Sequence, residues 1–124
     1  MSIIKKTLAS MAIAAALFST SAFAAGGDAK VRAAGEETVA KVEAAANLAE
    51  KGGDKSEILK LLGEVRQSQK EFRYEQTERL RQRAGDKLKT AKEELESGNA
   101  NAPATLKATL ELYKEMLKIY NAAH

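Results

Sequence analysis

The sequence has no cysteine and no tryptophan, and its 124 residues include one proline and one histidine, Pro103 and His124. The absence of cysteine excludes disulfides, thiolate metal sites and covalent c-type haem. A lone histidine excludes the paired Glu-x-x-His motifs of a di-iron bundle. Met116 and His124 lie on one predicted helix and cannot ligate opposite faces of a haem iron. These absences predict a protein that is not an enzyme and has no cofactor, with a weakly bound divalent metal as the open alternative.

Aromatic residues are also few, at 5% of the chain, and the net charge is small. The formal charge of +3 includes Lys5 and Lys6. Residues 1–24 contain no acidic side chain, so without them 18 basic and 17 acidic side chains remain, a net charge of +1. So small an excess gives no electrostatic reason to expect nucleic acid or an anionic membrane as partner.

Residues 1–24 have the pattern of a secretory signal peptide. Two lysines precede an apolar run over 8–18, and Ala22-Phe23-Ala24 forms a small-x-small cleavage site. The run is about half of the roughly 20 residues that a membrane-spanning helix needs. A retained anchor is the alternative, but the pattern favours cleavage, export to a bacterial periplasm, and no stable membrane anchor afterwards.

The remainder of the chain is predicted to be all-α, a four-helix bundle built from a duplicated helical hairpin. Glycine-containing turns at 52–53 and 98–103 each lead into an amphipathic stretch with helical spacing. A shift of 48 superposes Ile58 on Leu106, Leu62 on Leu110, Val65 on Tyr113 and Phe72 on Tyr120. The preceding stretches match at a shift of 46, which places Val42, Ala45 and Ala49 on Leu88, Ala91 and Leu95.

Residues 25–35 are small and polar, and we predict a flexible lead-in there, followed by the bundle over 36–124. The first helix is expected from Glu36 to Lys51, because two glutamates in the first turn suit the helix dipole. Asp54 is a capping residue for the second helix. Pro103 suits the first turn of the last helix, which runs to about Tyr120 and is predicted to be the most buried.

The segment after Phe72 allows two interpretations. Between Glu64 and Ala84 there is no glycine or proline, but the apolar stripe is interrupted over 73–79. A turn near Tyr74–Thr77 would separate two helices and complete a bundle within one chain. A single helix from Ser56 to Ser97 would have 42 residues, roughly 63 Å long, and would need a partner chain. The duplication and the interrupted stripe favour the turn.

Charged side chains form two groups. Arginines gather between 66 and 83, and Glu75–Arg79, Lys89–Glu93 and Lys92–Glu96 have the four-residue spacing of helical ion pairs. We expect a solvated, self-paired face, with an acidic partner or a phosphate as the alternative. The carboxylates of 36–37 and 93–96 are expected on the solvated surface. Tyr113 and Tyr120 lie on apolar stripes and are expected in the core, in preference to stacking on a ligand.

His124 is the one candidate metal ligand. An imidazole can ligate copper or nickel, and carboxylates are abundant in the chain. Against this, a single ligand at a helix end that frays would be a solvent-exposed tail.

The stretches AEKGGDKSEILKLLGEVRQSQK and AKEELESGNANAPATLKATLELYKEML resemble the periplasmic small metal-binding protein family. The resemblance covers most of 36–120 and implies an exported four-helix bundle of short helices separated by glycine turns. A looser resemblance connects the chain with soluble b-type cytochrome bundles. The family's activity depends on many histidines along its helices, and the helices predicted here carry none, so those metal residues have no counterpart.

Together these observations predict an exported, non-enzymatic helical bundle that acts as a binding or interaction module. Its partner would be an unidentified protein or a second copy in a homodimer. The first alternative is weak periplasmic binding or buffering of copper, nickel or another divalent ion through carboxylates and His124. The second is a chaperone-like stress protein with a charged helical surface.

Overall fold

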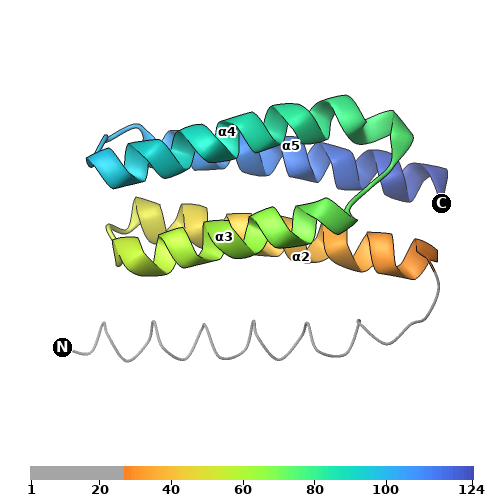
Figure 1. Cartoon of the computed structure of the whole chain (residues 1–124), viewed down its shortest axis with the longest axis horizontal. Helices are drawn as coiled ribbons and strands as arrows, with labels where there is room; N and C mark the ends of the chain where they lie inside the picture. Colours follow the sequence, from red (N-terminus) through yellow and green to blue (C-terminus); the bar gives the residue numbers. More distant parts are fainter. Residues whose placement is uncertain (1–26) are drawn as a thin grey trace.

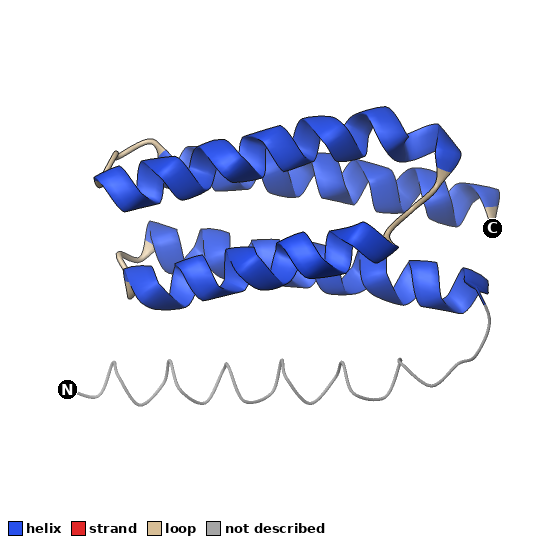
Figure 2. Ribbon diagram, viewed as in Figure 1, coloured by secondary structure: helices blue, strands red, loops and turns tan. Residues whose placement is uncertain are grey.

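The computed structural model describes residues 27–124, which form a four-helix bundle (Figure 1). Its helices are α2 (Gly27–Glu50), α3 (Lys55–Glu71), α4 (Glu78–Ser97) and α5 (Ala102–Ala123). A short 3-10 helix, η2 (Glu75–Thr77), precedes α4. Figure 2 shows helices joined by short loops, and no strand occurs in this part of the chain. The predicted all-α four-helix bundle is confirmed.

The helices run alternately up and down, and their packing is uneven. Helix α2 packs closely against α3 and α5, and α5 packs closely against α2 and α4. The remaining neighbours, α3 and α4, make the least extensive contact of the four adjacent pairs. In Figure 1 both lie on the near side of the bundle.

The core is apolar, and α5 contributes its largest side chains, Tyr113 and Tyr120. Both are buried, as their positions on the apolar stripe predicted. Each of the four residue pairs related by the shift of 48 is buried on both sides. Any two amphipathic helices of one bundle bury their apolar positions, whether or not they share a common origin. The duplication itself therefore stays a prediction.

The first helix begins nine residues earlier than predicted, at Gly27 instead of Glu36. The expected flexible lead-in is therefore helical over 27–35. Val31 and Ala34 contribute to the core, and Gly35 lies against the Phe72 ring, so tertiary packing outweighs the weak local signal. The predicted signal peptide and Ala25–Gly26 lie outside the described residues.

The connection between α3 and α4 confirms the interpretation with a turn. Phe72 is fully buried at the C-terminus of α3, and Tyr74 has an extended backbone with φ −153° and ψ 129°. The hydroxyl of buried Thr77 donates to the Tyr74 carbonyl oxygen at 3.1 Å. Burial of Phe72 and Thr77 therefore reverses the chain without glycine or proline.

The other two reversals follow the sequence signals. Gly52 and Gly98 have φ of 69° and 74°, the left-handed conformation that favours glycine. The Asp54 carboxylate accepts from the Ser56 backbone N–H at 3.2 Å, which caps α3. Within 27–124, every helix falls short of the length and apolarity that a membrane span requires.

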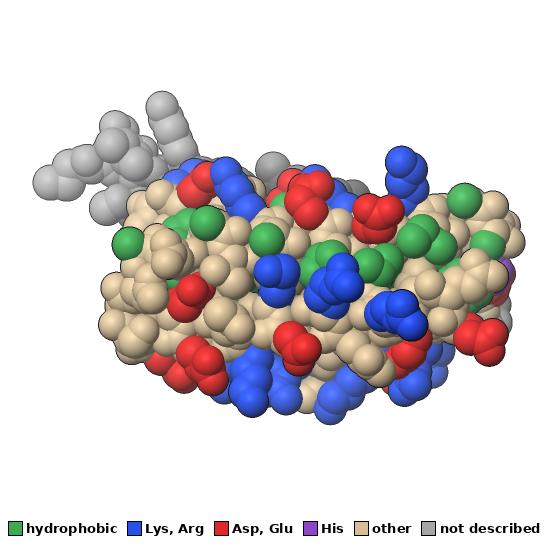
Figure 3. Space-filling view, turned by 90° about the horizontal axis from the view of Figure 1, so that it is seen from above, with side chains coloured by type: hydrophobic (Ala, Val, Ile, Leu, Met, Phe, Trp, Pro, Cys, Tyr) green, Lys and Arg blue, Asp and Glu red, His purple; other side chains and the backbone are tan. Residues whose placement is uncertain are grey.

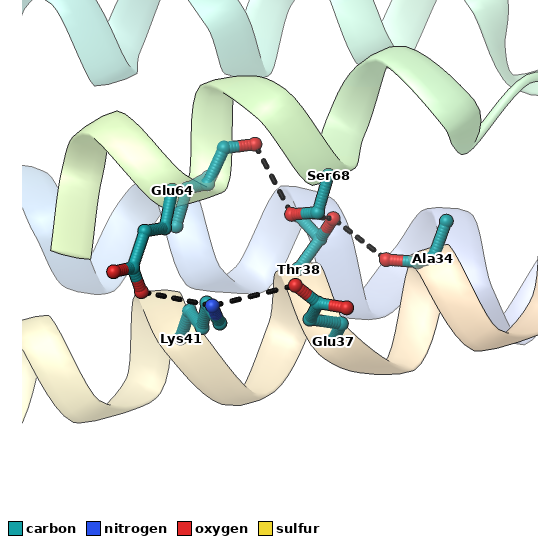
Figure 4. A network of polar contacts seen from close by, with 7 residues as sticks. Ala34, Glu37, Thr38, Lys41, Glu64 and Ser68 are labelled. Carbon is teal, nitrogen blue, oxygen red and sulfur yellow. Dashed lines mark hydrogen bonds and ion pairs between the residues drawn. The ribbon is translucent and has the colours of Figure 1, made fainter. Parts of the chain in front are cut away.

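Helices α2 and α3 are also joined by polar contacts (Figure 4). The Thr38 and Ser68 hydroxyls lie 2.9 Å apart in the core, and Thr38 donates to the Ala34 carbonyl oxygen at 2.7 Å. Nearby, Lys41 Nζ lies 2.8 Å from a Glu64 carboxylate oxygen. Burial lowers the pKa of Lys41, but the hydrogen bond and charge of Glu64, followed by those of Glu37, more than offset it and leave this pKa raised. These contacts fix the register of α2 on α3.

Candidate functional site

Polar and aromatic side chains meet at the end of the bundle where α2 begins and α5 ends. We call Asp28, Arg32, Tyr74, Tyr120 and His124 the terminal cluster. In Figure 1 the start of α2, the α3–α4 connection and the C-terminus all lie at the right-hand end. The cluster therefore joins three segments that are distant in sequence.

His124 is an exposed terminal residue, as the sequence suggested, but its ring packs against the bundle. Its ring stacks on Tyr120, with centroids 4.1 Å apart and planes at 17°. The edge-on contact with Tyr74 has a centroid distance of 5.1 Å. The side chain keeps 25% exposure, and the imidazole is visible at the edge of the molecule in Figure 3. The stacking joins His124 to the residue four positions earlier, on the last turn of α5.

The hydrogen bond of one ring nitrogen fixes the tautomer of His124. Nδ1 lies 2.9 Å from the Tyr120 carbonyl oxygen, which can only accept, so Nδ1 carries the proton and donates it. In the neutral ring, Nε2 therefore has its lone pair free. This nitrogen lies 3.5 Å from Oδ1 of Asp28. The geometry thus aims an imidazole acceptor at a carboxylate oxygen.

Tyr120 orients the Asp28 carboxylate. Its hydroxyl donates to Oδ1 of Asp28 and lies 3.1 Å from the carbonyl oxygen of the same residue. Burial, followed by this hydrogen bond, raises the pKa of Tyr120 to about 12. The phenol therefore stays protonated at neutral pH and acts as a hydrogen-bond donor to the carboxylate.

Arg32 does not neutralise Asp28. Its Nε donates to the Asn121 side-chain oxygen at 3.1 Å, and its guanidinium carbon lies 5.7 Å from the centre of the Tyr120 ring. Within the described residues, Asp28 has no lysine or arginine nitrogen within 4.0 Å. The carboxylate is 63% exposed, so it can bind a cation from solution.

The terminal cluster has two metal-ligating side chains, Asp28 and His124. Within 27–124, no group of three or more His, Asp or Glu side chains converges on one point. The sequence singled out His124 but not Asp28, which fell in the predicted lead-in. Its position in the first turn of a helix is the one sequence signal that would have pointed to it.

Comparison with known proteins gives no family assignment. No family model, curated protein or solved structure matches the chain. The functional argument therefore rests on the geometry of the described residues.

The tyrosines predict how stability depends on pH. The pKa of Tyr120 is about 12 in the folded protein against an ordinary 10.0, and burial raises the pKa of Tyr113 as well. Because the folded state holds these protons more tightly, stability should fall as pH rises from about 10 to 12. The urea midpoint measured across this range should decline less steeply in Tyr120→Phe. An equal decline in both proteins would contradict the assignment.

Proposed function

We propose that this chain is an exported, non-enzymatic binding protein that takes up a divalent transition-metal ion at the terminal cluster. The single observation that carries the proposal is the 3.5 Å contact between Nε2 of His124 and Oδ1 of Asp28. Two acceptors that face each other repel unless a cation lies between them. Either a proton or a metal ion can fill this position.

The geometry suits a metal ion. Zinc binds histidine nitrogen and carboxylate oxygen at about 2.0–2.2 Å, so two such ligands at a tetrahedral angle lie about 3.4 Å apart. The separation of 3.5 Å requires little rearrangement. Metal-ligating histidines commonly donate their other N–H to a backbone carbonyl, as His124 does to Tyr120. The tautomer and ring orientation that a metal requires are therefore already set.

The composition of the site indicates which ions it would hold. One imidazole nitrogen and one carboxylate oxygen suit Zn²⁺, Cu²⁺ and Ni²⁺. With two protein ligands, the remaining positions would be taken by water, which favours weak, exchangeable binding. This is the behaviour of a buffer or carrier and not of a permanent structural site.

Equilibrium dialysis or calorimetry with Zn²⁺, Cu²⁺ and Ni²⁺ tests the proposal on residues 25–124, which include the whole described bundle. We expect one ion per chain, with affinity reduced at least tenfold, about 1.4 kcal/mol, in both His124→Ala and Asp28→Asn. Glu115→Gln removes an exposed carboxylate from α5, the helix that His124 follows, and should have no effect.

Two results would contradict the metal site. Absence of binding at millimolar metal would show that the pair formed by Asp28 and His124 does not hold a metal ion. Binding of equal strength in His124→Ala, Asp28→Asn and the unaltered protein would place the ion elsewhere on the surface.

A further inference from the structure

The charge of the chain is unevenly distributed. Between Arg66 and Lys92 there are nine basic and four acidic side chains, a net charge of +5. The rest of the described chain has nine basic and thirteen acidic side chains, a net charge of −4. The overall charge of +1 after residue 24 therefore conceals a basic region formed by the end of α3 and most of α4. Figure 3 shows Lys and Arg side chains in a row along the lower edge of the molecule.

Three contacts establish how α3 and α4 face each other. A Cβ on Gly85 would lie 4.0 Å from the Gln69 side-chain oxygen. At one end of the pair, Lys55 Nζ lies 3.4 Å from the Glu96 carbonyl oxygen. At the other end, Arg73 lies 3.8 Å from Glu78. Helical spacing through these contacts gives the facing positions as 55, 59, 62, 66 and 69 on α3 and 78, 82, 85, 89, 92 and 96 on α4, with Arg73 in the connection between the helices.

The middle of the α3–α4 interface carries positive charge. Its facing positions include Arg66, Lys89 and Lys92, and all three side chains are exposed. We call these three residues the cationic seam. The antiparallel register places Arg66 across from the helical turn that holds Lys89, with Lys92 one turn further along α4. Glu78 and Glu96 occupy the first and last facing positions on α4, so the positive charge is confined to the middle of the interface.

The cationic seam is not neutralised by the chain itself. Within the described residues, none of its three side chains forms an ion pair within 4.0 Å. The predicted pairs Lys89–Glu93 and Lys92–Glu96 do not form. Nor does Glu75–Arg79, because Glu75 lies in η2, where the four-residue spacing of an α-helix does not apply. Glu78 instead pairs with Arg81 and Arg73, so the expected self-paired face forms there but does not include the three residues of the cationic seam.

The seam lies where the bundle is least closely packed. Helices α3 and α4 make the least extensive contact of the adjacent pairs, and Gly85, one turn before Lys89, has no side chain. On the adjoining side of α3, a Cβ on Gly63 would meet no atom within 4 Å. An extended or helical segment can therefore lie against the exposed side chains of Arg66, Lys89 and Lys92.

We infer that the cationic seam is a docking surface for an acidic polypeptide segment of a partner protein. Charge complementarity supports this occupant, and the acidic ends of the seam limit it to a short segment. A membrane surface fits less well, because a plane of negative charge would also meet Glu78 and Glu96. This inference goes beyond the proposed metal binding and does not depend on it, since it involves none of the residues of the terminal cluster.

The test uses a fluorescent ten-residue oligoglutamate peptide and residues 25–124. The seam variant carries Arg66→Gln, Lys89→Gln and Lys92→Gln. A matched control carries Lys107→Gln, Lys114→Gln and Lys118→Gln on α5, which lowers the net charge equally. We expect anisotropy to show peptide binding that weakens with salt, falls at least tenfold in the seam variant, and stays within twofold in the control.

Four outcomes would overturn the inference. Equal losses in both variants would indicate general charge attraction. Competition by inorganic phosphate at the same concentration of negative charge would indicate a small-anion site. Seam-dependent binding to anionic lipid vesicles, without peptide binding, would indicate a membrane surface. Sedimentation that shows a dimer in the unaltered protein and a monomer in the seam variant would identify a second copy as the occupant.

Discussion

Replacing Phe72 with alanine should reduce the free energy of unfolding by about 3 to 5 kcal/mol. The side chain is fully buried, and its ring meets Tyr120 edge-on with centroids 6.4 Å apart. It also covers Gly35 of α2 and ends α3. The substitution would leave a cavity where three segments meet. Against a typical total stability of about 5–15 kcal/mol, this loss is large.

Urea unfolding followed by circular dichroism measures the effect. Phe72→Leu is the control, because it keeps most of the apolar volume and should lose only about 1 kcal/mol. If Phe72→Ala and Phe72→Leu were equally stable, the ring would not have the buried position described.

Gly35 should tolerate no side chain, and Gly35→Leu should destabilise the protein by about 3 kcal/mol or more. A Cβ built at this position would lie 2.8 Å from Phe72 Cε1 and 3.1 Å from Leu117 Cδ1. Phe72 is enclosed and cannot move away at low cost. The close approach of α2 to α3 and α5 therefore depends on glycine here.

Gly63→Leu is the matched control for Gly35→Leu. Both glycines lie inside helices, but Gly63 is exposed, and a Cβ there would meet no atom within 4 Å. Leucine has a higher helix propensity than glycine, so this variant should gain up to about 0.8 kcal/mol. Opposite signs for the two substitutions, measured by the same urea unfolding, are the expected result. A gain in stability for Gly35→Leu would refute the close contact.

Sequence periodicity predicted the fold because most of the core follows it. The spacing of Ile58, Leu62 and Val65 places them on one helical face, and all three are buried. The start of α2 could not be predicted in this way. Its first residues are small and polar, and what makes them helical is contact with Phe72 and with α5, which lie far along the chain. Local propensity contains no information about such contacts.

Of the two metal-ligating residues of the terminal cluster, only His124 was predicted from the sequence, because Asp28 joins it through contacts between distant parts of the chain. His124 is a candidate by its residue type, and the four-residue spacing from Tyr120 is the sequence signal for their stacking. Asp28 and Tyr120 are 92 positions apart, and only the closed bundle brings them together. The arginine group is self-paired in part, because Arg73 and Arg81 both pair with Glu78, but the predicted pair Glu75–Arg79 is absent because Glu75 lies in η2.

The uneven helix packing has a consequence for the order in which the bundle forms. Helices α3 and α4, which are consecutive in the chain, pack least, whereas α2 and α5, at opposite ends, pack closely. Because α2 is synthesised before α5, the face of α2 that meets α5 stays uncovered until α5 has been made. Closing that long loop has an entropic cost that local hairpins avoid. Until α5 is made, the unfinished chain therefore exposes an aggregation-prone apolar face on α2. A premature stop before α5 would make that exposure permanent.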